Sequence, residues 1–503
     1  MELDARGFTD GTTLDTDLCI VGAGPAGLVL SAELVDAQCD VLVLESGSAR
    51  SGPEILALND GDLSGDDYNG VGRTRHRGVG GTSALWNSVV GGRTAAKYAP
   101  LDPGDFEERP GYDHSGWPFG IAELREDYAR AQRICGLGQF AYDAATWTSA
   151  GHEPWAASGP ALVSRVYQGG TRAALVEPLR ASIARATNVR LCTHATAVAM
   201  RPDAANRRIV ELSIATPGGP RWSVRAKRVV LAAGAVENAR MLLLAGDGSA
   251  VPGNGSGWVG CGFMEHPRDR ALVLRPHASG VYAQSSFYDQ RKAADGTWLI
   301  GRLALSDEVL ASGRVLNASG TLIPRLGSAI RRAREVIPGF AARWMPTEAH
   351  GWSSRRNPAR VFDGFTVLLN VEQSPHAENR VTLSARRDSL GVPLPSLHWR
   401  WRADDHERLK RLRAIVATEL AAIGEVTIDV ESRPDPNANH HAGTTRMHDD
   451  PAHGVTDRDG RVHGTENLYI AGASTFPTAG FANPVLTIVA LAVRLARHLR
   501  SEC

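Results

Sequence analysis

The stretch DLCIVGAGPAGLVLSAELVDAQCDVLVLE, residues 17–45, indicates the fold class most clearly. An apolar run, a glycine-rich turn, a helical pattern and a second apolar run predict a strand, a helix and a second strand. Gly22, Gly24 and Gly27 complete the spacing GxGxxG at the turn. In such a βαβ unit the first glycine permits the bend, the second lets the backbone approach a pyrophosphate, and the third lets the helix pack on the strand. The stretch therefore predicts a dinucleotide site.

An acidic residue supports the same interpretation. Glu45 ends the second predicted strand, about 20 residues beyond the turn, where a carboxylate accepts hydrogen bonds from ribose hydroxyls. The phosphates would sit at the positive end of the helix. An NADP site would more naturally carry a basic residue here, so FAD and NAD both remain open at this point.

A second glycine-rich segment, NGVGRTRHRGVGGTSALWN, spans residues 69–87. Its small residues favour a loop against the cofactor, carried by Gly80, Gly81, Thr82 and Ser83. Its basic residues have an alternative interpretation as a solvated run on a mobile surface loop. That alternative applies to Arg73, Arg75 and Arg77.

Further along the chain, two segments show different patterns of apolar residues. Residues 228–244 read as an apolar strand, a glycine turn and a helix that begins near Glu237, a second unit able to face the dinucleotide. Between about 266 and 432 several alternating strands are followed by an amphipathic helix over 404–423. This part predicts an antiparallel substrate lobe with one covering helix.

Composition limits the possible partners. The 503 residues, 43% of them hydrophobic, can bury two or three lobes. Lys plus Arg (55) equals Asp plus Glu (55), so we expect no nucleic-acid partner. The apolar stretch 484–499 is too short for a membrane span and contains two arginines. Residues 1–15 contain no signal-peptide core. Six scattered cysteines indicate no metal site and favour a reducing cytoplasm.

The motifs, taken in order, resemble the glucose-methanol-choline (GMC) oxidoreductases, and within them the branch of pyranose oxidase, fructose dehydrogenase and bacterial glycoside and aminoglycoside oxidoreductases. The resemblance runs from near residue 17 to near 499. It is most specific at the C-terminal end. The motifs are GAGPAG, GVGGTSALW, SGWPFGIAEL, VVLAAGAVENAR, FMEHP, EQSPHAENRVTLS, NANHHAGTTRM and ENLYIAGASTFPTAGFANPVLT.

The resemblance implies an α/β fold, with a Rossmann-like FAD-binding domain and a discontinuous second α+β domain built on an antiparallel sheet. We expect residues 1–95, 161–265 and 432–503 to form the FAD domain. We expect residues 96–160 to be a cover and substrate-lobe insertion and 266–431 to be the substrate-binding domain.

The resemblance also implies a catalytic pair. The family's HxxGT pattern selects His440, because Gly443 and Thr444 follow it; His441 would then be a packing neighbour. The partner position falls on Asn483, for which capping of the final helix after Pro484 is the structural alternative. We expect His440 to act as the base while Asn483 holds the same hydroxyl oxygen.

FAD should be bound non-covalently. Covalently flavinylated relatives carry a histidine before the tryptophan of the loop, whereas Leu85 precedes Trp86 here. Asn87 stands near the expected flavin N5, although a turn role suits it equally well. The residues expected to bind the cofactor are Gly22, Ala23, Gly24, Pro25, Ala26, Gly27, Glu45, Ser46, Gly80, Gly81, Thr82, Ser83, Trp86, Asn87, Ala197, Ala233, Gly234, Glu237, Gly472, Ala473, Pro484 and Val485.

The expected activity is oxidation of a sugar-like alcohol, either a sugar, glycoside or aminoglycoside hydroxyl, with oxygen or a quinone-like compound as electron acceptor. Two alternatives share the fold: a flavin-dependent lyase and a non-catalytic flavoprotein. The substrate itself is not readable from the sequence. Trp344, Trp352, Trp399 and Trp401 could stack on sugar rings, but we favour a place in the core.

Overall fold

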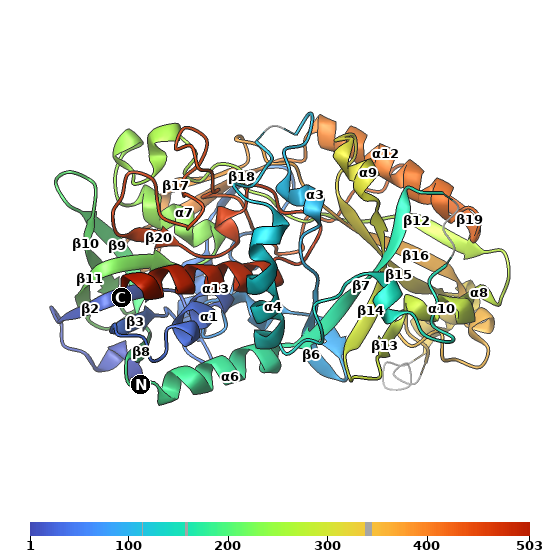
Figure 1. Ribbon diagram of the computed structural model, residues 1–503, viewed down its shortest axis with the longest axis horizontal. Coiled ribbons are helices and arrows are strands. Elements are labelled where there is room, and N and C mark those ends of the chain that lie inside the picture. Colours follow the sequence, from blue (N-terminus) through green and yellow to red (C-terminus); the bar gives the residue numbers. More distant parts are fainter. Residues whose placement is uncertain (113, 156–158, 338–344) are drawn as a thin grey trace.

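The computed structural model describes residues 1–112, 114–155, 159–337 and 345–503. Two large sheets lie side by side along the long axis of the molecule (Figure 1). Trp344 falls outside the described residues. Trp352, Trp399 and Trp401 are buried, which confirms their place in the core.

The first sheet carries the sequence-predicted βαβ unit. Among the described residues its order is β1-β8-β3-β2-β11-β10-β9, and β20 pairs with the second half of β11. All pairings are parallel except those of β10 with β9 and with β11. The strands are β1 (Glu2–Asp4), β2 (Thr13–Val21), β3 (Val41–Leu44), β8 (Val189–Thr193), β9 (Thr196–Pro202), β10 (Ile209–Ala215), β11 (Arg221–Leu231) and β20 (Leu468–Ile470).

This sheet is buried because helices cover it. β3 is apolar at every position and wholly buried, as parallel strands between helical layers are. α1 packs against both α6 and α13. The helices of this half are α1 (Pro25–Glu33), α2 (Pro53–Leu56), α4 (Arg125–Ile134), α6 (Arg172–Arg185), α7 (Ala235–Leu243) and α13 (Val485–Glu502).

The second sheet is antiparallel throughout. Its order is β19-β12-β16-β15-β14-β7-β6-β5, and β13 pairs with β14. The strands are β5 (Ser88–Val90), β6 (Arg93–Tyr98), β7 (Leu162–Thr171), β12 (Arg268–Pro276), β13 (Gln290–Lys292), β14 (Trp298–Leu305), β15 (Ala318–Leu326), β16 (Phe362–Val371) and β19 (Gly424–Ile428). Its helices are α3 (Pro103–Phe106), α5 (Ala144–Trp147), α8 (Val281–Gln284), α9 (Asp307–Ala311), α10 (Ser328–Val336) and α12 (Ala403–Leu420).

The sheets do not follow the expected segment limits everywhere. β5 and β7 come from segments placed with the cofactor domain and β6 crosses the expected limit between residues 95 and 96, yet all three pair in the antiparallel sheet. β17 (Arg380–Arg387) and β18 (Pro393–Trp399), expected in the substrate lobe, instead form a small sheet with β4 (Asp62–Gly65). Parallel pairing of β18 with β4 joins segments more than 300 residues apart, which local sequence patterns do not reveal.

Two further findings concern the cysteines and the helices. A disulfide joins Cys39 to Cys503 and so ties the end of α13 to the segment before β3. The six scattered cysteines did not indicate this pairing, because a separation of 464 residues gives no spacing signal. None of the described helices is long and apolar enough to cross a bilayer.

Candidate active site

One cavity begins where the parallel strands of the first sheet end. It encloses about 1430 Å³ up to its open mouth and runs from the βαβ turn to the C-terminal segments around residues 440 and 483. Twenty of the residues expected to bind cofactor or substrate line it. They are Gly22, Gly24, Pro25, Ala26, Glu45, Ser46, Gly81, Thr82, Ser83, Trp86, Ala197, Ala233, Gly234, Glu237, His440, Gly472, Ala473, Asn483, Pro484 and Val485.

The glycine turn is packed as tightly as its spacing predicts. Gly22 has a φ of +109°, and a Cβ there would lie 2.6 Å from the carbonyl oxygen of Ala232. A Cβ on Gly27 would lie 1.9 Å from the carbonyl oxygen of Gly22, so α1 meets the strand closely. Gly24 precedes α1, and no side chain caps the first turn of that helix. Its free amides therefore face the cavity as an anion-binding end.

Glu45 stands at the end of β3, at the cavity wall. Its two oxygens accept hydrogen bonds of 2.9 Å from the amides of Ala23 and Gly47. These bonds fix the carboxylate at the turn, and each oxygen keeps a second lone pair for another donor.

The basic residues of the glycine-rich loop are not all solvated, although the alternative interpretation of this loop expected them to be. Arg73 is exposed, but the side chains of Arg75 and Arg77 are only 9% and 12% exposed and form ion pairs with Glu237. Arg240 contacts the same carboxylate at 3.3 Å. Burial raises the pKa of Glu237, but the three arginines outweigh it and hold that pKa well below its usual range. Arg75 and Arg77 are thus wall residues of the cavity, which the sequence did not indicate.

His440 is held by two contacts from the FMEHP motif. Its amide donates to Oε2 of Glu265 at 3.0 Å, and its Nδ1 lies 3.0 Å from Nδ1 of buried His266. Burial first, and then the neighbouring His266, holds the pKa of His440 well below its usual value. The imidazole is therefore neutral at neutral pH, with Nε2 left outside this hydrogen bond.

His441 also lines the cavity, but its ring is engaged elsewhere. Its Nε2 lies 2.8 Å from the hydroxyl of Tyr68 and 3.4 Å from Oε1 of Glu265. Tyr68 donates to the same Oε1 at 2.7 Å. Burial lowers the pKa of His441 to about 3 and raises that of Glu265 to about 7.

Asn483 lies directly before α13, half-buried at the cavity wall. The expected helix cap is wrong: α13 begins at Val485, Pro484 occupies the cap position, and no side chain caps the helix. Pro484 is itself helical at φ −69° and ψ −11°, which moves the helix entry one residue beyond the asparagine. The carboxamide makes no hydrogen bond with another described residue.

Four expected cofactor residues do not line the cavity. Ala23 and Gly27 belong to the turn itself, and Gly80 donates its amide to the carbonyl of Ala23 at 2.8 Å. Asn87 follows Trp86 outside the lining. The cavity also includes residues that the sequence did not single out, among them Asn59, His76, Ala195, Met241, Asn439 and Ile488.

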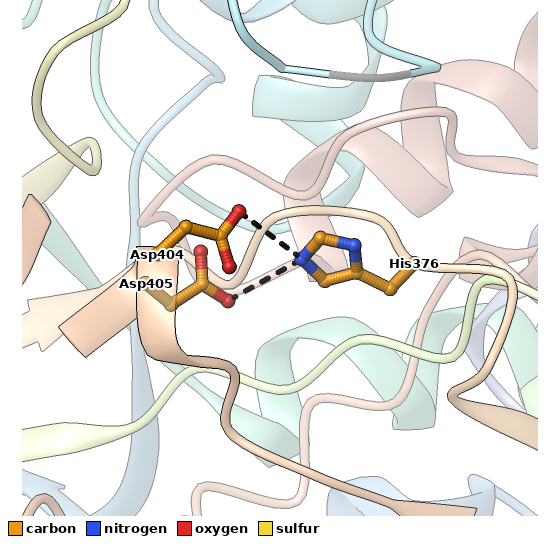
Figure 2. A group of neighbouring side chains, drawn as sticks. All are labelled: His376, Asp404 and Asp405. Atoms are coloured by element: carbon orange, nitrogen blue, oxygen red, sulfur yellow. Dashed lines mark ion pairs between the residues drawn. The ribbon is translucent and has the colours of Figure 1, made fainter. Parts of the chain in front are cut away.

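A group outside this cavity combines one histidine with two acids (Figure 2). Nε2 of His376 lies 4.0 Å from Asp404 and 3.8 Å from Asp405, at the start of α12. Ser374 Oγ contacts the same Nε2 at 2.9 Å. Arg408 lies 3.4 Å from Asp404 and 3.7 Å from Asp405, so a cation already balances these acids and would repel a metal ion. We interpret the group as an ion-pair network at the helix start.

Comparison with known proteins shows what this chain is similar to. Residues 375–492 match the family described as GMC oxidoreductase, and residues 20–53 match the NAD(P)-binding Rossmann-like domain. Paromamine 6'-oxidase of Streptomyces fradiae is 27% identical over 97% of this chain and 91% of its own. The C-terminal part of the chain therefore carries the GMC oxidoreductase domain.

Two further known proteins are similar to nearly the whole chain. The large subunit of fructose dehydrogenase from Gluconobacter japonicus is 25% identical, covering 97% of this chain and 98% of that protein. The solved structure of pyridoxine 4-oxidase from Mesorbium loti has a TM-score of 0.53 at 18% identity, over 96% of this chain and 98% of its own. This likeness shows that the two proteins share one overall fold, a mixed Rossmann sheet beside an antiparallel sheet.

Proposed function

We propose that this protein is a GMC oxidoreductase that uses FAD to oxidise a sugar-like alcohol to a carbonyl compound, with His440 as the base. One observation carries the proposal: His440 and Asn483, distant in sequence, line the same cavity as the glycine turn and Glu45. Relatives named as sugar or aminoglycoside oxidases and dehydrogenases support a sugar-like substrate.

The residues of the cavity fit FAD. The uncapped first turn of α1 suits the pyrophosphate, and Glu45 suits the ribose hydroxyls. The cavity then continues to the uncapped N-terminus of α13, whose partial positive charge suits the electron-rich end of a flavin ring. FAD, when bound, supplies the acceptor for the hydride that leaves the alcohol carbon.

Of the two neighbouring histidines, His440 is the one suited to accept the hydroxyl proton. In the tautomer that serves a base at Nε2, His440 donates Nδ1–H to Nδ1 of His266 and receives the hydroxyl proton on Nε2. His441 is less suited, because Tyr68 and Glu265 engage its Nε2. Loss of that proton and of a hydride from the same carbinol leaves the carbonyl product.

Asn483 would orient the substrate hydroxyl. Its carboxamide is open to the cavity, where it would hydrogen-bond the substrate oxygen that His440 deprotonates. A single oriented hydrogen bond contributes less than proton transfer, so its loss should reduce the rate less than loss of the base.

We further propose that FAD is bound non-covalently. Leu85 cannot bond to a flavin methyl group, although His76 is a cavity residue that could. Acid precipitation of the yellow protein should therefore release all of the FAD into the supernatant. Flavin that stays with the precipitated chain would contradict this statement.

The test of the proposed reaction is anaerobic mixing of the holoenzyme with sugars, glycosides and polyols. We expect the flavin absorbance to bleach and a carbonyl product to form. A flavin that no alcohol bleaches would favour the lyase or the non-catalytic alternative. Admission of air with peroxide detection, or addition of a quinone, then identifies the electron acceptor.

A further inference from the structure

Two cations share one face of the antiparallel sheet with a row of polar residues. Lys97 of β6 pairs with Gly169 of β7, and Arg268 of β12 pairs with Asn370 of β16. Paired residues point to the same face, and successive residues alternate between faces. The printed registers of β6, β7, β14, β15, β16 and β12 therefore place these residues on one face: Lys97, Tyr167, Arg302, Ser319, Asn370 and Arg268.

This face looks toward the catalytic segments. The guanidinium of Arg302 lies 4.1 Å from the ring of Phe481, two residues before Asn483. Lys97 Nζ lies 5.0 Å from the ring centre of Tyr167, which in turn lies 6.3 Å from that of Phe481. Arg268 and Lys97 are both among the groups that, after burial, lower the pKa of His440. The opposite face is covered by α12, whose Arg413 pairs with Asp269.

The charge on this face is not balanced. Arg302 faces Asp102 at 3.7 Å, but neither Lys97 nor Arg268 has a side-chain hydrogen bond or ion pair with any described residue. Both are half-buried, so part of each side chain stays accessible. Burial and then Arg268 lower the pKa of Lys97 to about 8, which still leaves the amine protonated at neutral pH. Partly desolvated cations without a partner cost free energy and are typical of functional sites.

Nearby acids do not supply the missing charge. Glu372 is committed to Arg109 through a bidentate pair that is fully buried. Burial raises the pKa of Asp105 to about 8, so this group is mostly neutral at neutral pH. Burial raises the pKa of Glu265 to about 7, although Arg268 is among the groups that lower it. Within the described part of the chain Glu265 forms no ion pair with Arg268, and it accepts hydrogen bonds from Tyr68 and from the His440 amide.

We propose that Lys97 and Arg268 form a subsite for a carboxylate of the substrate. The oxidised alcohol would then belong to a hydroxy acid of the sugar-acid class. An arginine fork and a lysine ammonium both make charge-assisted hydrogen bonds to a carboxylate, and an amino-sugar would be repelled. This inference rests on the proposed alcohol oxidation and narrows it.

The test compares matched substrates that differ in one carboxylate. Anaerobic stopped-flow reduction of the holoenzyme is measured with D-gluconate and D-glucitol, with D-glucuronate and D-glucose, and with D-glycerate, glycerol and glycerol 3-phosphate. D-glucosamine provides the cationic arm. The variants are Lys97→Met, Arg268→Met, the charge-preserving Lys97→Arg, and Lys410→Met, an exposed lysine, as control. Flavin content and melting temperature establish that each variant is folded, and calorimetric binding of the same probes gives a readout without turnover.

For at least one pair, we expect the ratio of the flavin reduction rate constant to Kd to be at least 10-fold higher for the carboxylate than for the neutral member. The same ratio should be lower for glucosamine than for glucose. Lys97→Met and Arg268→Met should remove most of this preference, while Lys97→Arg and Lys410→Met should keep it. Equal use of neutral and acidic members, or an equal loss for both in the variants, would overturn the inference. A preference for glycerol 3-phosphate over glycerate would overturn the assignment to a carboxylate. If no alcohol bleaches the flavin, the proposed oxidation fails, and calorimetry alone then decides the subsite.

Discussion

His266 should act as a positioning residue for the base His440. Replacing it should slow flavin reduction by an amount that depends on whether the new side chain can accept a hydrogen bond. Its Nδ1 lies 3.0 Å from Nδ1 of His440, and the ring is fully buried. In His266→Leu the His440 Nδ1–H loses its acceptor in a buried place, which costs about 1–3 kcal/mol. With a factor of ten for each ~1.4 kcal/mol, flavin reduction should slow roughly 5- to 150-fold. His266→Asn places an amide oxygen near the lost Nδ1 and should recover most of the rate.

The pH profile separates positioning from a general loss of structure. Burial and then the like charge of His266 lower the pKa of His440; His266→Asn removes that charge but keeps an acceptor for Nδ1–H, so the pKa should move upward. A base works only when unprotonated, so the acid limb of kcat/KM should shift to higher pH in His266→Asn. Anaerobic stopped-flow reduction over a pH series gives both quantities. A His266→Leu enzyme that is reduced at the wild-type rate, or a His266→Asn enzyme with an unmoved acid limb, would show that His266 does not position the base.

Three further outcomes follow from the same contacts. In the wild type, reduction should stay constant as pH falls through the usual histidine value of ~6.5 and should decline only in more acid solution, because the pKa of His440 is lowered; a decline centred at 6.5 would contradict this. Glu237→Gln leaves Arg75, Arg77 and Arg240 without their carboxylate and should lower stability by about 3–5 kcal/mol in denaturant melts, whereas Glu407→Gln at an exposed pair should change it little. Cys503→Ser should lower stability by about 2–5 kcal/mol relative to the oxidised wild type, and addition of reductant should bring the wild type down to the variant.

The parts of the fold that local sequence determines could be predicted. The βαβ unit of residues 17–45 was readable because apolar runs, glycine spacing and helix period all lie within one continuous stretch. The structure confirms it as β2, α1 and β3. The C-terminal motif likewise brought His440 and Asn483 forward, and both line the same cavity as the glycine turn.

The parts that depend on distant partners could not be predicted. The sequence allowed Arg75 and Arg77 to be interpreted as solvated charges, because no residue near them in the sequence indicates an ion pair with Glu237. The same reason hid the disulfide from Cys39 to Cys503 and the pairing of β18 with β4. His266 was present in a recognised motif, but only the fold shows its ring against His440.

The most direct measurement is anaerobic flavin reduction by a substrate of the wild type, compared between wild type, His440→Ala and His453→Ala, an exposed histidine used as control. We expect three yellow, folded proteins, with reduction about 10²- to 10⁴-fold slower only in His440→Ala. Reduction of His440→Ala at the rate of the other two would show that His440 is not the base.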